Sequence, residues 1–355
     1  MKRTGHLVER IAGLDNLLLA YTKARRGKQC KREVIDFGEH LDERLQLLRS
    51  QILAGRVDVG HYHYFRIYDP KERVICAASF SERVLHHALM NVCHEAFDRR
   101  LIDDTFATRR GKGVYAALDK AGRAVSRYAY AGKLDFRKYY DSIRHDVLKC
   151  GLRRVFKDAR LLSIFSSIID SYAVSDGCGL PIGNLTSQYF ANFYLSALDH
   201  RCKEEWGARA YVRYMDDILL ADDDADALRS RVRTMQAYAA EHLHLTFKPP
   251  LIAKCLNGIP FLGYRLKPHR LLLSGRSKRR FRTKLRAYDR LLASGEWDEL
   301  TYSLHLQPLL SFVRHAESER FRRACIAPAD ARREWVEPCE PRWQLEQQRE
   351  ELPLL

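Results

Sequence analysis

Two adjacent carboxylates, Asp216 and Asp217, lie in the middle of an otherwise apolar and aromatic stretch, residues 211–221. Two short β-type runs joined by turn-tolerant residues predict a β-hairpin with both carboxylates at its tip. Unpaired carboxylates away from water are costly, so such a hairpin favours bound cations. Mg²⁺ suits this arrangement because it takes oxygen ligands and keeps positions open for substrate phosphates. The alternative is a solvated turn, which is how we interpret the other acidic runs, 103–104 and 222–224.

A third carboxylate, Asp135, ends a predicted strand 81 residues before Asp216, and predicted helices separate the two. If this strand lies beside the hairpin, the three carboxylates converge. Three carboxylates that hold two metal ions, about 3.5–4 Å apart, form a site for in-line phosphoryl transfer. One ion would activate an attacking hydroxyl, and the other would bridge a triphosphate and stabilise the leaving pyrophosphate.

The elements that must position these carboxylates predict an α+β fold. Apolar residues at helical spacing predict helices within residues 6–55, and alternation predicts strands at 62–68 and 73–77. Helices that alternate with strands around an antiparallel hairpin describe an α+β palm. Further elements are expected as helices at 81–97 (with Ser81 as N-cap), 146–156, 161–172, 185–206 and 225–243, a strand at 245–248 and a hairpin at 259–266.

The composition indicates a folded protein that is attracted to polyanions. The chain has 355 residues, of which 46% are apolar, and its formal net charge is +16. This charge favours nucleic acid first and an anionic membrane surface second as the partner. No apolar run reaches the roughly 18 residues of a membrane span, and the first ten residues lack a signal-peptide core, so we expect a cytosolic protein. The nine cysteines include no Cys-x-x-Cys pair, which argues against a zinc ribbon.

Taken in order, these motifs resemble the reverse transcriptase family over residues 60–320. The stretch from Asp135 to Asp141 is similar to the family's catalytic Asp followed by an aromatic pair, and Tyr214-Met215-Asp216-Asp217 is similar to its signature tetrapeptide. Residues 70–75 and 106–113 resemble the two finger motifs of the family, and residues 247–248 and 261–264 resemble its two later palm motifs. The basic segment 270–290, which holds nine Lys or Arg and one Asp, resembles the thumb.

The resemblance implies a right-hand polymerase fold with fingers, an antiparallel palm sheet with helices, and a helical thumb. It implies an RNA-directed DNA polymerase that uses two Mg²⁺ ions, with Mn²⁺ as the alternative, and binds template RNA, a cDNA/primer duplex and dNTPs. The expected domains are an N-terminal helical extension at 1–60, fingers at 61–130, a palm at 131–268 with a finger insertion at about 145–180, a thumb at 269–325 and a C-terminal tail at 326–355.

The resemblance also assigns site residues. Asp135, Asp216 and Asp217 are expected to be catalytic and, with the Phe136 backbone carbonyl, to bind the metals. The expected dNTP-binding residues are Arg73, Arg109, Lys112, Tyr140, Ile182, Gly183 and Lys248. The expected template or primer contacts are Gln188, Met215, Arg279, Arg280, Arg282 and Lys284.

Several of these roles compete with a structural alternative. Tyr140 is either a steric gate against the ribose 2′-hydroxyl or a core tyrosine, and its neighbour Tyr139 is expected in the core. Arg109 and Lys112 either bind phosphate or belong to a solvated basic loop. Gly183 is expected where a loop approaches a nucleotide too closely for a side chain. The remaining alternatives are a surface lysine for Lys248, a helix cap for Gln188 and a merely soluble basic helix for the thumb residues.

The loop 180–188 carries the subfamily prediction. Its Ile182 and Gln188 resemble the diversity-generating retroelement reverse transcriptases, where most bacterial relatives have Gln and Pro. Those enzymes copy a template-repeat RNA into cDNA with errors at adenines, which diversifies a target gene. They work with a small basic accessory protein, itself sometimes oligomeric, in a bacterium, archaeon or phage. The alternatives are a retron-like, defence-associated or group II intron-derived enzyme, or a catalytically dead RNA-binding scaffold.

Overall fold

The computed structural model describes residues 3–68 and 72–326. The start of the predicted first finger motif and the tail from residue 327 lie outside the described residues. The chain forms two compact units, one of residues 1–121 and 130–252, the other of residues 122–129 and 253–355. The second unit begins before the expected thumb boundary at 269, and the predicted domain boundaries stay predictions.

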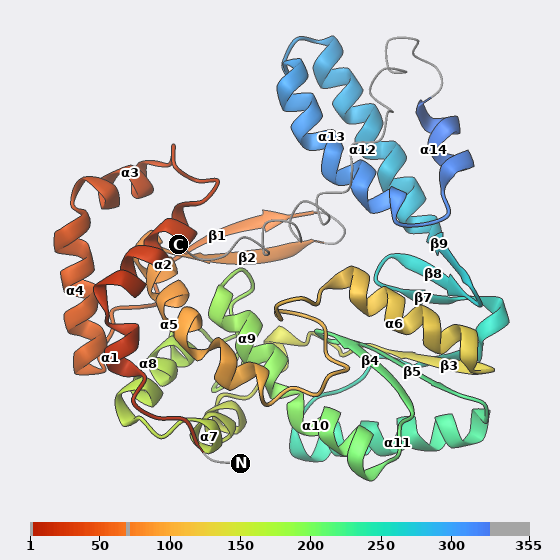
Figure 1. Ribbon diagram of the computed structural model, residues 1–355, viewed down its shortest axis with the longest axis horizontal. Helices are drawn as coiled ribbons and strands as arrows, with labels where there is room; N and C mark the ends of the chain where they lie inside the picture. The colour runs from red at the N-terminus through yellow and green to blue at the C-terminus, as the bar shows by residue number, and fades with distance from the viewer. Residues whose placement is uncertain (1–2, 69–71, 327–355) are drawn as a thin grey trace, which may run out of the picture. The chain divides into compact units, whose positions relative to one another are not determined.

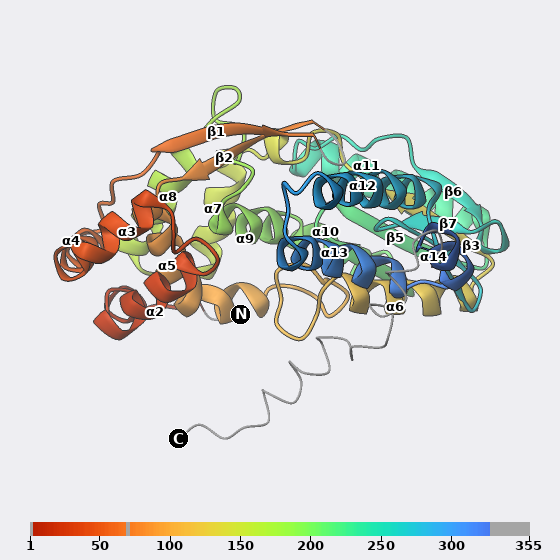
Figure 2. The same cartoon turned by 90° about the horizontal axis from the view of Figure 1, so that it is seen from above.

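The first unit opens with four helices, α1 (Val8–Ile11), α2 (Leu14–Arg25), α3 (Arg32–Glu39) and α4 (Leu41–Ala54). They lie within the predicted helical region, residues 6–55. Helix α2 runs beside α5 (Phe80–Asp98) (Figure 2). Asn16 fixes the two helices together, because its amide donates to the carbonyl of Ala88 at 3.0 Å.

An antiparallel ribbon of β1 (Tyr62–Ile67) and β2 (Arg73–Ala78) precedes α5, as predicted. The N-cap of α5 differs from the prediction. Ser79, not Ser81, is the capping residue, since its side chain accepts the backbone N–H of Glu82 at 3.3 Å. Helix α5 therefore begins one residue earlier than the apolar spacing suggests.

The central sheet has the strand order β4-β5-β3-β6, with β4 (Ala210–Tyr214), β5 (Asp217–Asp222), β3 (Tyr130–Leu134) and β6 (Leu251–Lys254). Figure 1 shows β4, β5 and β3 of this sheet. Strands β4 and β5 form the predicted hairpin, and β3 pairs antiparallel with β5. The helix α11 (Ala225–His242) packs on this sheet, with Leu228 close to Gly132 of β3. The predicted adjacency of the Asp135 strand and the hairpin is therefore present.

Two expected elements differ from the structure. The helix predicted over 185–206 is divided into α9 (Leu185–Tyr194), α10 (Ser196–His200) and a π-helical turn (Arg201–Glu205). Apolar periodicity cannot reveal the division, because Leu195 at the break and Leu198 after it are both fully buried. The strand predicted at 245–248 is a single bridge between Phe247 and Phe136, since the pairing ends after one residue pair.

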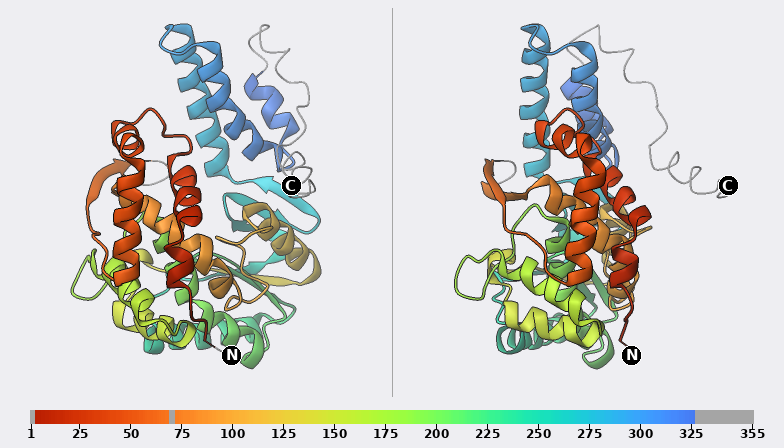
Figure 3. Two further views of the ribbon diagram at one scale, coloured as in Figure 1. Left: turned by 60° about the vertical axis from the view of Figure 1, so that its left-hand side comes forward. Right: turned by 90° about the vertical axis from the view of Figure 1, so that its left-hand side faces the viewer.

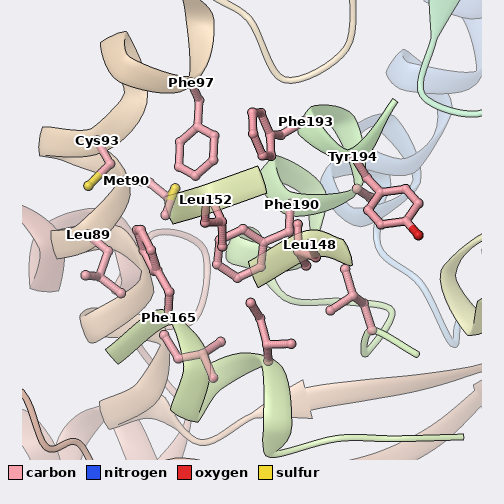
Figure 4. Packing of buried hydrophobic residues seen from close by; sticks show 14 of the residues in the cluster. Leu89, Met90, Cys93, Phe97, Leu148, Leu152, Phe165, Phe190, Phe193 and Tyr194 are labelled. Carbon is pink, nitrogen blue, oxygen red and sulfur yellow. The ribbon is translucent and has the colours of Figure 1, made fainter. Parts of the chain in front are cut away.

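The core of the first unit is aromatic where α5 meets α9. Phe97 contacts Phe156, Phe165, Phe190 and Phe193, with ring centroids 5.4–6.2 Å apart (Figure 4). Each fully buried Phe contributes roughly 1.5–3 kcal/mol of hydrophobic stabilisation. Phe165 lies on α8 (Ala159–Asp170), and Phe156 directly follows α7 (His145–Val155).

The second unit holds a meander of β7 (Ile259–Phe261), β8 (Tyr264–Lys267) and β9 (Arg270–Leu273), followed by α12 (Gly275–Ala293), α13 (Glu299–Arg314) and α14 (Glu319–Ile326). Helices α12 and α13 lie side by side (Figure 3). Ser274 caps α12 and Asp298 caps α13, each accepting the N–H three residues on. The observed mixture of helices with antiparallel sheets confirms the predicted α+β class. Among the described residues, no helix is long and apolar enough to cross a membrane.

Candidate active site

The tip of the β4–β5 hairpin carries the two adjacent carboxylates. Tyr214 pairs with Asp217, so Met215 and Asp216 form the turn, and Met215 takes a left-handed φ of 53°. Leu134, the last residue of β3, pairs with Ile218 of β5. Asp135 therefore follows β3 at the same edge of the sheet as Asp217. The structure brings the three predicted carboxylates together from segments 81 residues apart.

The charges in this site repel one another. Burial, the neighbouring carboxylate of Asp217 and that of Asp135 raise the pKa of Asp216 to about 6. Two lysines balance the other carboxylates. Lys133 Nζ lies 2.9 Å from Asp217 Oδ1, and Lys248 Nζ lies 2.6 Å from Asp135 Oδ2. The protein therefore supplies two ammonium groups where the sequence predicts metal ions.

The donor set suits a hard divalent cation, although the carboxylates are not arranged as a metal site. Within residues 3–68 and 72–326, no group of three or more His, Cys, Asp or Glu side chains is placed to hold a metal ion. The Oδ1 of Asp217 is buried, and the Lys133 ammonium 2.9 Å away balances its charge. Carboxylate oxygens are the ligands that Mg²⁺ prefers. Metal binding by Asp135, Asp216, Asp217 and the Phe136 carbonyl stays a prediction.

Lys248 belongs to segment 245–248, which was expected to form a strand and pairs with residues 135–137. Its N–H donates to the carbonyl of Asp135 at 2.8 Å, and Arg137 donates to the carbonyl of Thr246 at the same distance. The rings of Phe136 and Phe247 stack below with centroids 3.9 Å apart. This short pairing brings the Lys248 ammonium to the Asp135 carboxylate.

Tyr140 lies close to the hairpin tip. Burial and the carboxylate of Asp216 raise the pKa of the Tyr140 phenol well above its usual value, while Arg73 opposes the shift. Arg73 lies at the exposed start of β2, and both it and Asp216 are close enough to Tyr140 to affect the pKa of its phenol. Tyr139 is buried as expected, and its hydroxyl donates to the Ala191 carbonyl at 2.5 Å.

The loop that carries Ile182 packs on the ribbon. The Ile182 carbonyl accepts the N–H of Cys76 at 2.8 Å. Gly183 has a φ of 124°, and a Cβ there would lie 2.8 Å from Cγ2 of Ile75. The structure thus gives a reason for glycine that the sequence did not: the loop closely approaches β2. On the other side, His145 holds this loop, because its Nε2 lies 2.8 Å from the Gly179 carbonyl.

Two of the predicted triphosphate ligands are engaged by the protein itself. Arg109 Nε donates to Asp98 at 2.6 Å, its Nη1 donates to the Ile102 carbonyl at 2.6 Å, and its side chain is 9% exposed. Lys112 Nζ lies 2.7 Å from an Asp103 carboxylate oxygen. These ion pairs hold the loop after α5, and a phosphate ligand would have to compete with them.

The predicted template and primer residues lie in both units. Gln188 is exposed on α9, whose N-cap position is Asn184. Met215 forms the hairpin turn. On α12, Arg282 lies over the ring of Phe321 at 5.0 Å. Arg279, Arg280 and Arg282 are exposed, and Lys284 is half-buried. Their contacts with nucleic acid stay predictions.

A buried ionic network behind the hairpin was missed by sequence reasoning. Arg213 of β4 and Asp199 of α10 are both fully buried and form an ion pair. Asn192 and Tyr211 complete the network. The only signal in the sequence is one arginine in an apolar strand, which also fits the alternating exposure of an edge strand. Asp104 was misread as a solvated turn residue as well, since it is 6% exposed and pairs with Lys120 and Lys203.

An α+β unit with a carboxylate-tipped hairpin in an antiparallel sheet defines a polymerase palm. A family model described as "Reverse transcriptase (RNA-dependent DNA polymerase)" matches residues 69–266, more than half of the chain. The chain therefore belongs to the reverse transcriptase family, which confirms the predicted family and its class of RNA-directed DNA polymerases. Reverse transcriptases in general use divalent metal ions.

Individual relatives are distant. Protein YkfC of Escherichia coli is 23% identical over 277 residues, which cover 62% of this chain and 71% of that protein. Among solved structures, apo telomerase from Candida tropicalis is 13% identical with a TM-score of 0.45, covering 60% of this chain and 55% of that one. Telomerase from Candida albicans, in complex with a fragment of telomeric RNA, is 12% identical with a TM-score of 0.44, covering 77% and 63%. The chain spans less than two thirds of either telomerase chain.

Proposed function

We propose that this protein is an RNA-directed DNA polymerase whose catalytic residues are Asp135, Asp216 and Asp217. The observation that carries the proposal is the convergence of these carboxylates at one edge of the central sheet, where each raises the negative charge around the others. Mg²⁺ bound by these carboxylates and the Phe136 carbonyl would stabilise the charge that develops on a transferring nucleotide. Tyr140 and Arg73, beside Asp216, would contact the sugar and phosphates of that nucleotide.

The first test is primer extension on an RNA template with Asp216→Asn. This change keeps the size of the side chain and removes its charge, so we expect the extension rate to fall by at least about 10³-fold with little change in melting temperature. Asp223→Asn, at the exposed position directly after β5, is the matched control and should extend like the unchanged protein. Full activity of Asp216→Asn would refute the assignment. A cellular function that survives the substitution would favour the RNA-binding scaffold instead.

We further propose that the enzyme belongs to a diversity-generating retroelement and copies a template-repeat RNA with errors at adenines. The residue pair Ile182 and Gln188 supports this subfamily over retron-like, defence-associated or intron-derived enzymes. The template RNA, a primer duplex, dNTPs and a small basic accessory protein would be its partners in a bacterial, archaeal or phage-infected cytoplasm. The fingers, palm and thumb would follow the boundaries expected from the sequence.

Ile182 provides the test of the subfamily. An apolar side chain over the incoming nucleotide offers contact without hydrogen bonding, so a misaligned base pair loses less there. We expect Ile182→Gln to lower substitutions opposite template adenine by about tenfold, equivalent to ~1.4 kcal/mol of discrimination. Sequencing of cDNA made on one RNA template measures the change, with Ile75→Val on the adjoining strand as the control for packing. Accurate cDNA from the unchanged protein would move it to a retron-like or intron-like role.

A further inference from the structure

One arginine behind the hairpin, Arg213 of β4, connects four segments of the first unit: its guanidinium binds three of them, and its backbone binds the fourth. Arg213 Nε donates to Asp199 at 2.7 Å, and Nη1 donates to Asn192 Oδ1 at 2.8 Å and to the Met215 carbonyl at 3.0 Å. Its Nη2 donates to the second Asp199 oxygen and to the Asn192 carbonyl. All five N–H donors of the guanidinium therefore have acceptors. The acceptors come from α9, α10 and the hairpin turn itself.

The fourth segment is the loop that leads into the second finger motif. The Arg213 N–H donates to the carbonyl of Asp104, and the Arg213 carbonyl accepts the N–H of Phe106, both at 2.9 Å. The Asn192 amide donates to the carbonyl of Ala107 at 2.8 Å. Arg213 and Asn192, which hydrogen-bond each other, therefore also hold the loop at 104–107.

The turn that Arg213 contacts needs outside support. Met215 has a φ of 53°, a left-handed conformation that side-chain-bearing residues rarely adopt. Such a conformation persists where the surroundings determine it, and it occurs at functional sites. The contact from Arg213 to the Met215 carbonyl is one such determinant. Asp216, whose carboxylate faces Asp135 and Asp217, is the next residue.

We propose that Arg213 is a positioning residue, which fixes the Met215–Asp216 peptide and so sets where the Asp216 carboxylate stands. Asp199 and Asn192 hold the guanidinium, and through Asn192 the loop at 104–107 shares the same anchor. This inference rests on the proposed function, because it gives Arg213 a role in the same active site. A buried ion pair gives weak evidence for stability alone, since apolar residues of similar volume often replace one without loss.

The test is Arg213→Lys, compared with Arg231→Lys. Lysine keeps the charge opposite Asp199 but lacks the planar fork that reaches Met215 and Asn192. Arg231 is a matched control: it pairs with Asp222 at the other end of β5 at 2.9 Å and donates to the Trp206 carbonyl at 3.0 Å. Where Arg213→Lys does not fold, Arg213→Gln combined with Asp199→Asn removes both buried charges together.

The first readout is steady-state primer extension with saturating template. We expect Arg213→Lys to lower kcat roughly 10–100-fold, because a small misplacement of a reacting group has this effect. Its KM for dNTP should stay within about twofold of the unchanged protein, which marks an interaction used in the transition state. Arg231→Lys should leave kcat unchanged. A proportional loss in both variants, following their melting temperatures, would show that Arg213 is merely structural.

The second readout does not depend on polymerase activity. Hydrogen exchange measured on a peptide that covers residues 211–220 should become roughly tenfold faster in Arg213→Lys and not in Arg231→Lys. If residues 211–220 exchange faster in Arg213→Lys but the unchanged protein does not extend a primer, the proposed function is wrong. The role of Arg213 in positioning the hairpin turn would still stand. Unchanged exchange at 211–220 would overturn the inference even if the enzyme is active.

Discussion

At the scale of single residues, the protein's own cations balance two of the three clustered carboxylates. Lys133 pairs with Asp217 and Lys248 pairs with Asp135, and each of these four side chains is between 26% and 41% exposed. Ion pairs this close to solvent are weak, contributing about 0–1 kcal/mol. The two lysines therefore neutralise the carboxylates without excluding a divalent ion. A bound ion would have to displace their ammonium groups from Asp135 and Asp217.

Lys133→Met tests this competition. Removing the ammonium leaves Asp217 without its ion pair, so we expect half-maximal primer extension at a roughly two- to fivefold lower Mg²⁺ concentration. A Mg²⁺ titration of the extension rate measures the shift. Lys203→Met is the matched control, because Lys203 pairs with Asp104 at 2.8 Å outside the site. If Lys133→Met needs more Mg²⁺ than the unchanged protein, the lysine assists the ion and does not compete with it.

The residues that sequence reasoning placed correctly share one property. Each carboxylate lies where an apolar strand ends or turns: Asp135 follows β3, and Asp216 and Asp217 lie at the turn between β4 and β5. The strand ends and the hairpin turn, both visible in the sequence, bring such residues together. Arg109 and Lys112 were harder, because their partners Asp98 and Asp103 are determined by how the chain folds after α5. Arg213 could not be recognised, since its role depends on acceptors from α9 and α10.

At the scale of elements, α5 is tied to the ribbon before it by Glu82. This buried carboxylate accepts the N–H groups of Gly60 and His61 at 3.1 and 2.8 Å. Ser79 caps the helix, and its own N–H donates to the His61 carbonyl at 3.0 Å. The sequence offers two serines, Ser79 and Ser81, and only these long-range contacts decide between them.

Ser79→Ala and Ser81→Ala separate the two serines. Loss of an N-cap costs about 1 kcal/mol, so Ser79→Ala should lower the free energy of unfolding by that amount. Ser81 caps nothing in the structure, and its substitution should change stability by less than about 0.5 kcal/mol. Denaturant unfolding of both variants measures the difference. The reverse order of effects would restore the N-cap predicted from the sequence.

At the scale of the whole molecule, the α+β class, the helical N-terminal region and the hairpin followed from periodicity and from turn residues. The division of the 185–206 helix did not, because buried apolar residues continue through it. The boundary at 252/253 between the two compact units was equally hidden, since the chain crosses it within the strand β6. Composition predicted a polyanion partner, and a net charge of +16 predicts RNA affinity that falls steeply with salt.

The stability of the first unit should depend on pH through His86 of α5. His86 is 1% exposed, and its Nε2 has no hydrogen-bond partner among the described residues. Burial, with a smaller effect of His87, lowers the pKa of His86 to about 3 from an ordinary 6.5. Between these values the unfolded chain binds a proton that the folded chain does not. Stability is therefore full above about pH 6.5 and is lost as the pH falls, by up to about 1.4 kcal/mol per pH unit.

His86→Leu removes this proton uptake, so its stability should fall less between pH 6.5 and 4.5 than that of the unchanged protein. The melting temperature as a function of pH measures the difference, with an expected relative shift of roughly 2–6 °C per pH unit. Other titrating groups cancel in the comparison because both proteins contain them. His63→Gln, an exposed histidine on β1, should follow the unchanged protein. If the melting temperatures of His86→Leu and the unchanged protein fall equally with pH, the prediction is wrong. His86 would then bind a proton in the folded protein, and its pKa would not be lowered by burial.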